Sequence, residues 1–97
     1  MNIYALSSGK GPSGIAIIWL SGHSILVIVK SISKQTTLKA KELNICKFYN
    51  PKNNVLIDAG LLLWFPAPNS YTGEDLAEFH LHGSNAVINT FLEALSH

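Results

Sequence analysis

Short apolar runs separated by polar and glycine-rich segments predict alternating strands and helices along this chain. Strands are expected in five stretches rich in β-branched and aromatic residues and bounded by turn residues: 3–7, 15–20, 43–49, 55–65 and 76–82. The third and fourth should form a hairpin through the turn Asn50-Pro-Lys-Asn-Asn54. An interruption of the fourth is expected near Asp58 to Gly60, because glycine weakens a strand.

Two further segments are predicted to be helical. Residues 85–96 follow the opening pair Gly83-Ser84 and carry apolar residues at helical spacing: Val87, Ile88, Phe91, Leu92 and Leu95. Residues 25–32 fit either a strand, by their β-branched content, or a crossover helix, by their position. We predict a helix, which Ser21 or Ser24 is able to cap. Strands interleaved with two helices indicate one small α+β domain with a mixed or antiparallel sheet.

The strand that ends at His82 has two chemically different faces. Strand alternation places Leu76, Glu78, His80 and His82 on one face, and Ala77, Phe79 and Leu81 on the other. The acidic turn Thr72-Gly-Glu-Asp75 precedes this strand, after a loop that contains two prolines and Tyr71. Three ionisable side chains therefore share a face beside an acidic loop, and a binding site could be built there.

Two chemistries are open for this region. Glu78, His80 and His82 could hold a metal ion such as zinc, with Glu74 and Asp75 nearby; the alternative is an ordinary polar strand face. Aromatic residues around the prolines could instead form a slot for a flat heterocycle. Core packing explains Trp64 and Phe65 equally well, which leaves Tyr71 as the better ligand candidate.

The low content of charged residues indicates that this chain does not expose its whole surface to water. Of its 97 residues, 47% are hydrophobic and only 13% charged, so the chain should either cover much of its surface with a partner or be a piece of a larger protein. We expect the second, because the last predicted helix is followed by no polar tail. All seven basic residues are lysines, and six lie between Lys30 and Lys52. A weak basic patch is possible there, although a solvated connecting region is the favoured interpretation.

The single cysteine and the lengths of the apolar runs give information on the cellular compartment. Cys46 has no partner for an internal disulfide and is expected to be a small buried hydrophobe in a reducing cytoplasm. The first residues show no signal-peptide pattern, and the longest apolar runs are too short to span a membrane.

The segment Gly9-Lys-Gly-Pro-Ser-Gly14 has the letters of a dinucleotide-binding loop. That motif needs a helix directly after it, whose N-terminal N–H groups face the phosphates, but strand-like residues follow here and Pro12 lacks an N–H. The pattern also fails as a nucleotide P-loop. We therefore expect a connection between two strands and no nucleotide site.

Several motifs together resemble one known family. Tyr4-Ala-Leu-Ser-Ser-Gly-Lys-Gly11, Gly14-Ile-Ala-Ile-Ile-Trp-Leu-Ser-Gly22 and Leu63-Trp-Phe-Pro-Ala-Pro-Asn-Ser-Tyr-Thr-Gly-Glu-Asp75, with Glu78 and His82-Gly83, look like the N-terminal domain of the MnmE/TrmE family of tRNA-modification GTPases. The likeness runs from Ile3 nearly to the last residue. It implies an α+β module similar to the folate-binding domains of aminomethyltransferases. It also implies a homodimer that binds 5-formyltetrahydrofolate or another tetrahydrofolate.

The resemblance also assigns residues and partners. The positions that match the family's motif are expected near the cofactor: Tyr71, Thr72, Gly73, Glu74, Asp75, Glu78 and His82. Full-length members add a helical and a GTPase domain, and they act with the FAD protein MnmG on the tRNA wobble uridine. Residues 1–97 would then form an N-terminal domain incomplete at its C-terminal end, without catalytic or metal-binding residues.

Three departures from the family's pattern leave other functions open. Trp19 and Lys10 stand where the pattern has arginines, and Ser84 replaces the second glycine of His-Gly-Gly. The change at position 19 removes a charge that could pair with a folate carboxylate. A ligand-free interaction module is therefore an alternative, as is a small metal-dependent enzyme that uses Glu78, His80 and His82.

Overall fold

A computed structural model of the chain describes residues 2–8, 14–68, 70 and 72–96. Its elements follow the order β1 (Asn2–Ser8), β2 (Ile15–Gly22), α1 (Leu26–Ser33), β3 (Leu43–Tyr49), β4 (Leu56–Phe65), β5 (Asp75–His82) and α2 (Asn85–Leu95). The predicted α+β class is confirmed, as are the helix near 25–32 and the hairpin of β3 with β4. Within the described ranges, no helix has the length and apolar character needed to cross a membrane.

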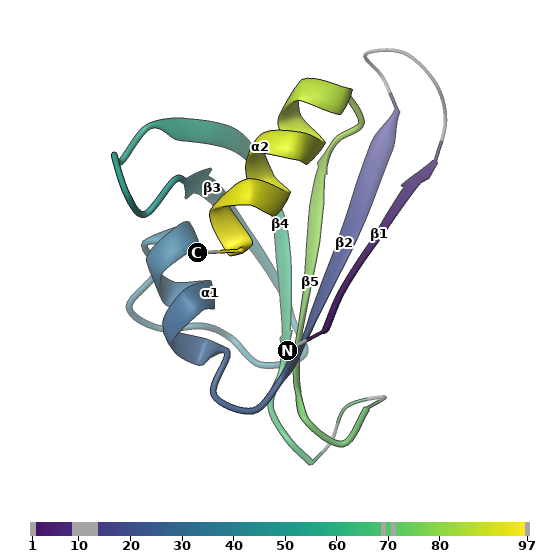
Figure 1. Ribbon diagram of the computed structural model, residues 1–97. Coiled ribbons are helices and arrows are strands. Elements are labelled where there is room, and N and C mark those ends of the chain that lie inside the picture. Colours follow the sequence, from purple (N-terminus) through teal and green to yellow (C-terminus); the bar gives the residue numbers. More distant parts are fainter. Residues whose placement is uncertain (1, 9–13, 69, 71, 97) are drawn as a thin grey trace.

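The strands form one sheet in the order β1-β2-β5-β4-β3, and all neighbouring strands are antiparallel (Figure 1). A single parallel bridge, between Ala40 and Trp64, lies outside these pairs in the described part of the chain. The central strand, β5, comes last of the five in the chain. It joins the β1–β2 hairpin to the β3–β4 hairpin.

Both helices cover the same face of the sheet (Figure 1). Helix α1 lies against β3, and α2 lies against β4 and β5. Three fully buried phenylalanines form the centre of this layer, with ring centroids 4.9 to 5.5 Å apart in edge-to-face geometry: Phe48, Phe79 and Phe91. Ala77, Phe79 and Leu81 all belong to the core, so the predicted apolar face of β5 is confirmed.

The two helices begin differently. Helix α2 follows Gly83-Ser84 as predicted, and Ser84 caps it: its Oγ accepts a hydrogen bond from the Val87 N–H at 3.1 Å. The predicted serine cap of α1 is wrong: Ile25 occupies the N-cap position and makes no side-chain bond. Ser21 is buried and hydrogen-bonds to a distant loop instead, and Ser24 adopts a positive φ of 63°.

Strand β4 is continuous, so the predicted interruption at Asp58 to Gly60 is wrong. A bulge absorbs the irregularity: Phe48 pairs with Asp58 and Tyr49 with Leu56, which leaves Ile57 as an extra residue. Gly60 stays within the strand because β5 passes directly beside it. A Cβ at this position would lie 2.0 Å from the carbonyl oxygen of His80.

The sheet face opposite the helices, here called the open face, has no secondary-structure layer over it in the described residues (Figure 1). Residues directly opposite in antiparallel pairs share a face, so one row crosses the open face from β1 to β3: Tyr4, Trp19, Glu78, Leu63 and Leu43. Several of its apolar side chains are well exposed: Tyr4 by 58%, Ile15 by 49%, Leu43 by 58% and Ile45 by 85%. These exposed apolar side chains lie on a face that neither helix covers.

Candidate functional site

A small apolar hollow lies on the open face, near the end of the sheet where the acidic loop enters β5. It has a volume of about 190 Å³ and is lined by Tyr4, Trp19, Ser21, Thr72 and Leu76. Strand pairing assembles it, since Tyr4 lies opposite Trp19 and Ser21 lies opposite Leu76. We call it the Trp19 hollow. Two aromatic rings and two hydroxyl groups line it together, so it can receive a flat ring that also forms hydrogen bonds.

Thr72 attaches the acidic loop to the sheet. Its Oγ1 lies 2.8 Å from the Oγ of buried Ser21, and it also accepts a hydrogen bond from the Glu74 N–H at 3.3 Å. Ser70 closes the same turn, because its Oγ donates to the Glu74 carbonyl. Gly73 has a φ of +77°, which glycine adopts without strain, and open space surrounds it. This turn holds Thr72 at the edge of the hollow.

The two acidic residues of the turn contact other parts of the protein. Asp75 accepts a hydrogen bond from the Ala67 N–H at 2.9 Å and so ties the proline loop to the start of β5. Glu74 lies 3.6 Å from the Nε2 of His23, a well-exposed residue that follows β2. Neither carboxylate lines the Trp19 hollow. Asp75 stabilises the loop that borders it.

Glu78 is a carboxylate on the open face beside the hollow. It lies opposite Trp19 on β2, and its Oε1 is 2.6 Å from the Nε2 of His80. Both side chains are about a quarter exposed or less. The open face therefore carries a partly buried carboxylate beside the indole of Trp19, placed to accept hydrogen bonds from the N–H groups of a ligand.

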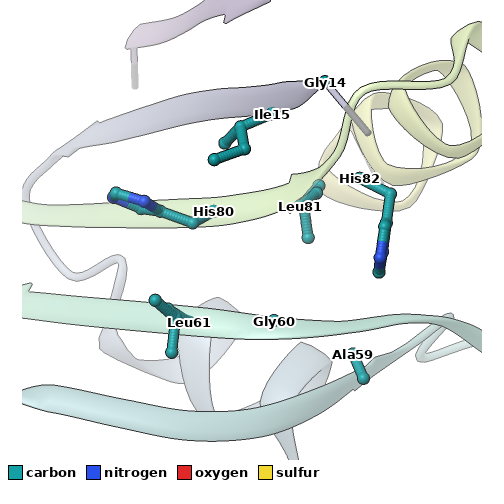
Figure 2. Close-up of a pocket in the computed structure, with 8 residues that line it drawn as sticks. All are labelled: Gly14, Ile15, Ala59, Gly60, Leu61, His80, Leu81 and His82. Carbon is teal, nitrogen blue, oxygen red and sulfur yellow. The ribbon is translucent and has the colours of Figure 1, made fainter. Parts of the chain in front are cut away.

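A second hollow lies beyond the Trp19 hollow along β5, where β4 and β5 separate after the Leu61–His80 pair. Its volume is about 340 Å³, and Figure 2 shows its lining: Gly14, Ile15, Ala59, Gly60, Leu61, His80, Leu81 and His82. Asp58 binds His82 twice, accepting from its backbone N–H at 2.8 Å and lying 2.8 Å from its Nδ1. These bonds bridge the two strands past the point where their pairing ends.

The geometry does not support the metal-dependent alternative. Glu78 is engaged with His80, whereas His82 points toward β4 and binds Asp58 (Figure 2). Throughout the described ranges, no group of three or more His, Cys, Asp and Glu side chains could hold a metal ion. Strand alternation does place the predicted trio on one face, but hydrogen bonding draws its members to different partners.

The residues predicted for the cofactor site therefore occupy three places. Thr72 lines the Trp19 hollow and Gly73 shapes its loop; Asp75 braces that loop, where Glu74 lies near His23; Glu78 and His82 lie further along β5. Tyr71 and Lys10 are outside the described residues. Sequence reasoning did not select Tyr4, Ser21 or Leu76 for this site. Cross-strand alternation identifies them only once the strand order is known.

The structure also bears on Trp64 and on the glycine-rich segment that begins at Gly9. Trp64 is 6% exposed and belongs to the core, so its packing role is the correct one of the two considered. The glycine-rich segment from Gly9 lies mostly outside the described residues. It is followed by strand β2 and not by a helix, as predicted, so the helix N-terminus that a dinucleotide phosphate needs is absent from residues 15–22.

Comparison with known proteins places this fold in a family. The sequence profile described as "GTP-binding protein TrmE N-terminus" matches residues 2–97. The chain is 44% identical over 99 residues to "tRNA modification GTPase gtpbp3, mitochondrial" of Dictyostelium discoideum, covering 96% of this chain and 19% of that protein. It is 45% identical over 96 residues to "tRNA modification GTPase MnmE" of Pelagibacter ubique, covering 99% of this chain and 22% of that protein.

A vertebrate relative is similar over the same region. The chain is 42% identical over 93 residues to "5-taurinomethyluridine-[tRNA] synthase subunit GTPB3, mitochondrial" of Danio rerio, which covers 96% of this chain and 18% of that protein. The chain thus spans about a fifth of the length of these curated relatives. It is an α+β domain, and these relatives are named as tRNA-modification proteins. The chain belongs to the TrmE N-terminal family, as the sequence motifs indicated.

Proposed function

We propose that this domain binds a reduced folate, 5-formyltetrahydrofolate or another tetrahydrofolate, with the pterin ring in the Trp19 hollow. The observation that carries the proposal is the joint lining of that hollow by two aromatic side chains and two hydroxyl groups: Tyr4, Trp19, Ser21 and Thr72. Aromatic faces suit a flat bicyclic ring, and the hydroxyls can exchange hydrogen bonds with its edge. Glu78, opposite Trp19, can accept from ring N–H groups.

The size of the hollow supports a site shared between two copies. Its volume of about 190 Å³ is small for a whole folate, since sites for ligands of that size usually have about 300–1,000 Å³. The remaining walls must come from elsewhere, and the open face around the hollow is apolar and uncovered. We propose that a second copy of the chain packs on this face, so that the folate is enclosed between the two protomers.

The wider role follows from the family. In full-length relatives the names describe tRNA-modification GTPases, and one names a taurinomethyluridine product. We propose that this domain serves such a protein as its folate-binding and dimerisation module, without catalysing a reaction itself. The GTPase activity, the MnmG-type FAD protein and the tRNA wobble uridine would then belong to the assembled protein.

Calorimetric titration with 5-formyltetrahydrofolate tests the ligand. Carried to millimolar ligand, it detects binding worth only about 4 kcal/mol. We expect saturable heat from the wild-type chain, its loss in Trp19→Ala, and its retention in Val27→Ala. Val27 is a suitable control because it is 73% exposed and lies on α1, on the other side of the sheet. A folded chain that releases no heat would contradict folate binding.

Sedimentation equilibrium tests the proposed dimer face. Ile45→Glu places a charge on the open face and should shift the chain toward monomer. Val27→Glu introduces the same charge at another well-exposed apolar position, on the helix layer, and should leave association unchanged. A wild-type chain that stays monomeric at high concentration, with and without folate, would overturn the shared site. Dimerisation without folate binding would favour the ligand-free interaction module.

A further inference from the structure

The lysines of this chain are concentrated along one edge of the fold. Between Lys30 and Lys52 the sequence holds six lysines and one acidic residue, Glu42, a formal charge of +5. The rest of the chain holds one lysine and five acidic residues, a formal charge of −4. The net charge of +1 therefore conceals a strong separation of charge between two parts of one small domain.

The fold gathers these lysines around β3, the edge strand beside α1 (Figure 1). Lys30 and Lys34 lie on α1 and at its end, and the Lys34 Nζ is 4.5 Å from the centre of the Tyr49 ring, at the end of β3. Asn44 fixes Lys39 beside the start of β3 through two hydrogen bonds to its backbone, at 3.2 and 3.1 Å. We call this cluster the lysine rim: Lys30, Lys34, Lys39, Lys41, Lys47 and Lys52.

The rim lysines form no ion pairs with carboxylates of the described residues. Among the described residues, every ion pair joins a histidine to a carboxylate, and no lysine takes part. Five of the six rim lysines are exposed, and Lys30 is half-buried. The acidic residues that could neutralise them lie on β4, β5, α2 and the loop before β5, with Glu42 as the exception. The rim therefore presents free positive charge to a partner.

The composition of the rim indicates the chemistry of that partner. Lysines supply point charges that attract phosphates, but they lack the planar fork with which arginine reads guanine edges. Tyr49, at the end of β3 beside the rim, has Lys34 over one face of its ring, so that face is not free to stack on an unpaired base. The seven residues of β3 extend over roughly 20 Å, enough for several successive phosphates.

We propose that the lysine rim binds the phosphodiester backbone of duplex RNA without reading its sequence. The choice of RNA rests on the proposed role in tRNA modification; the charge and its placement come from this chain. The rim lies at the β3 edge, whereas the Trp19 hollow is built mainly by β1, β2 and β5. The two sites therefore share no residue.

Fluorescence anisotropy with a labelled RNA hairpin, measured over a series of salt concentrations, tests this proposal. The test variant is K39Q/K47Q/K52Q, which removes three exposed charges at positions held through backbone bonds. Each lost phosphate contact should lower the salt slope by about 0.7–0.9, so we expect a decrease of about two units and an affinity loss of about tenfold or more at low salt. Lys10→Gln is the control, because Lys10 is the one lysine of the sequence outside residues 30–52.

Three results would overturn the proposal: no RNA binding by the folded wild-type chain, equal loss in the control and the triple variant, or stronger binding of polyglutamate than of RNA. The last would assign the rim to an acidic protein. Circular dichroism confirms that the variants are folded. Folate calorimetry on the triple variant separates the two proposals, because retained folate heat with lost RNA binding leaves the Trp19 hollow intact as a site.

Discussion

The hydroxyl oxygens of Ser21 and Thr72 lie 2.8 Å apart, although 51 residues separate them in the chain. Ser21 is 1% exposed at the end of β2, and Thr72 belongs to the acidic loop before β5. The contact fixes the loop against the sheet and forms one wall of the Trp19 hollow. Loss of this contact should therefore affect both the stability of the fold and the shape of the hollow.

Thr72→Val should destabilise the fold by about 1–3 kcal/mol, because it leaves the buried Ser21 hydroxyl without its partner. Ser21→Ala in the same background should restore part of that loss, since both partners are then removed. Urea unfolding of the two single variants and the double variant measures the coupling energy. Strict additivity would show that the two hydroxyls do not stabilise each other.

Phe91→Ala should cost about 3–5 kcal/mol, because its ring is fully buried against Phe48 and Phe79. A loss of this size is a large share of the stability of a small domain, so the variant should be mostly unfolded at 37 °C. Thermal unfolding followed by circular dichroism checks it. Val27→Ala, on the exposed side of α1, should change the midpoint little; an equal effect of both would contradict the assigned core.

Gly60→Ala and Gly73→Ala should differ for a geometric reason. At Gly60 a Cβ would lie 2.0 Å from the His80 carbonyl oxygen, so β4 and β5 must separate locally, at a cost of about 3 kcal/mol or more. At Gly73 no atom of the described residues lies within 4 Å of a Cβ, but the φ of +77° strains a non-glycine residue by about 1–2 kcal/mol. Denaturant midpoints compare the two. Gly73→Asn should recover part of the loss, whereas no residue should rescue position 60.

Alkaline pH should weaken the fold through Cys46. Burial raises the pKa of its thiol from 9.0 to about 11. Between these values the unfolded chain loses the thiol proton while the folded chain keeps it, so stability falls as pH rises through this window, by up to roughly 2 kcal/mol. Urea unfolding at pH 8 and pH 11 measures the fall. Cys46→Val should show a smaller one, and an identical fall would assign it to other groups.

The thiol of Cys46 should also react slowly at neutral pH, because it is both protonated and buried. Iodoacetamide labelling should therefore follow the rate at which the domain opens, and it should accelerate sharply in Phe91→Ala. Fast labelling of the folded wild-type chain would contradict the buried environment of this residue.

The secondary structure was predictable because most strands and the last helix carry clear periodicity. The alternation from Leu76 to His82 correctly assigned both faces of β5, and the apolar spacing from Val87 to Leu95 defined α2. The errors were local. Glycine and aspartate suggested a break in β4, but the close approach of His80 makes glycine compatible with a continuous strand at Gly60. Tertiary contact overrode the local preference.

The candidate site was predictable only in part, because the spacing of apolar residues identifies strands but does not show which strands are neighbours. Thr72 and Glu78 could be placed near one another from the chain alone. Tyr4 and Ser21 reach the hollow only because β2 pairs with both β1 and β5. The sequence predicts a strand break at Asp58, but in the structure this residue binds His82, which is 24 residues further along the chain. Such long-range partners also explain why the predicted trio of Glu78, His80 and His82 does not converge.

The place of β5 in the strand order has a consequence for how the domain forms during protein synthesis. Each half of the sheet is a local hairpin, and the halves meet only through β5, which the ribosome makes after the other four strands. Until His82 leaves the exit tunnel, the backbone N–H and C=O groups with which β2 and β4 pair to β5 have no partner. The nascent chain must therefore wait with two unjoined hairpins, a stage at which chaperones would be most useful.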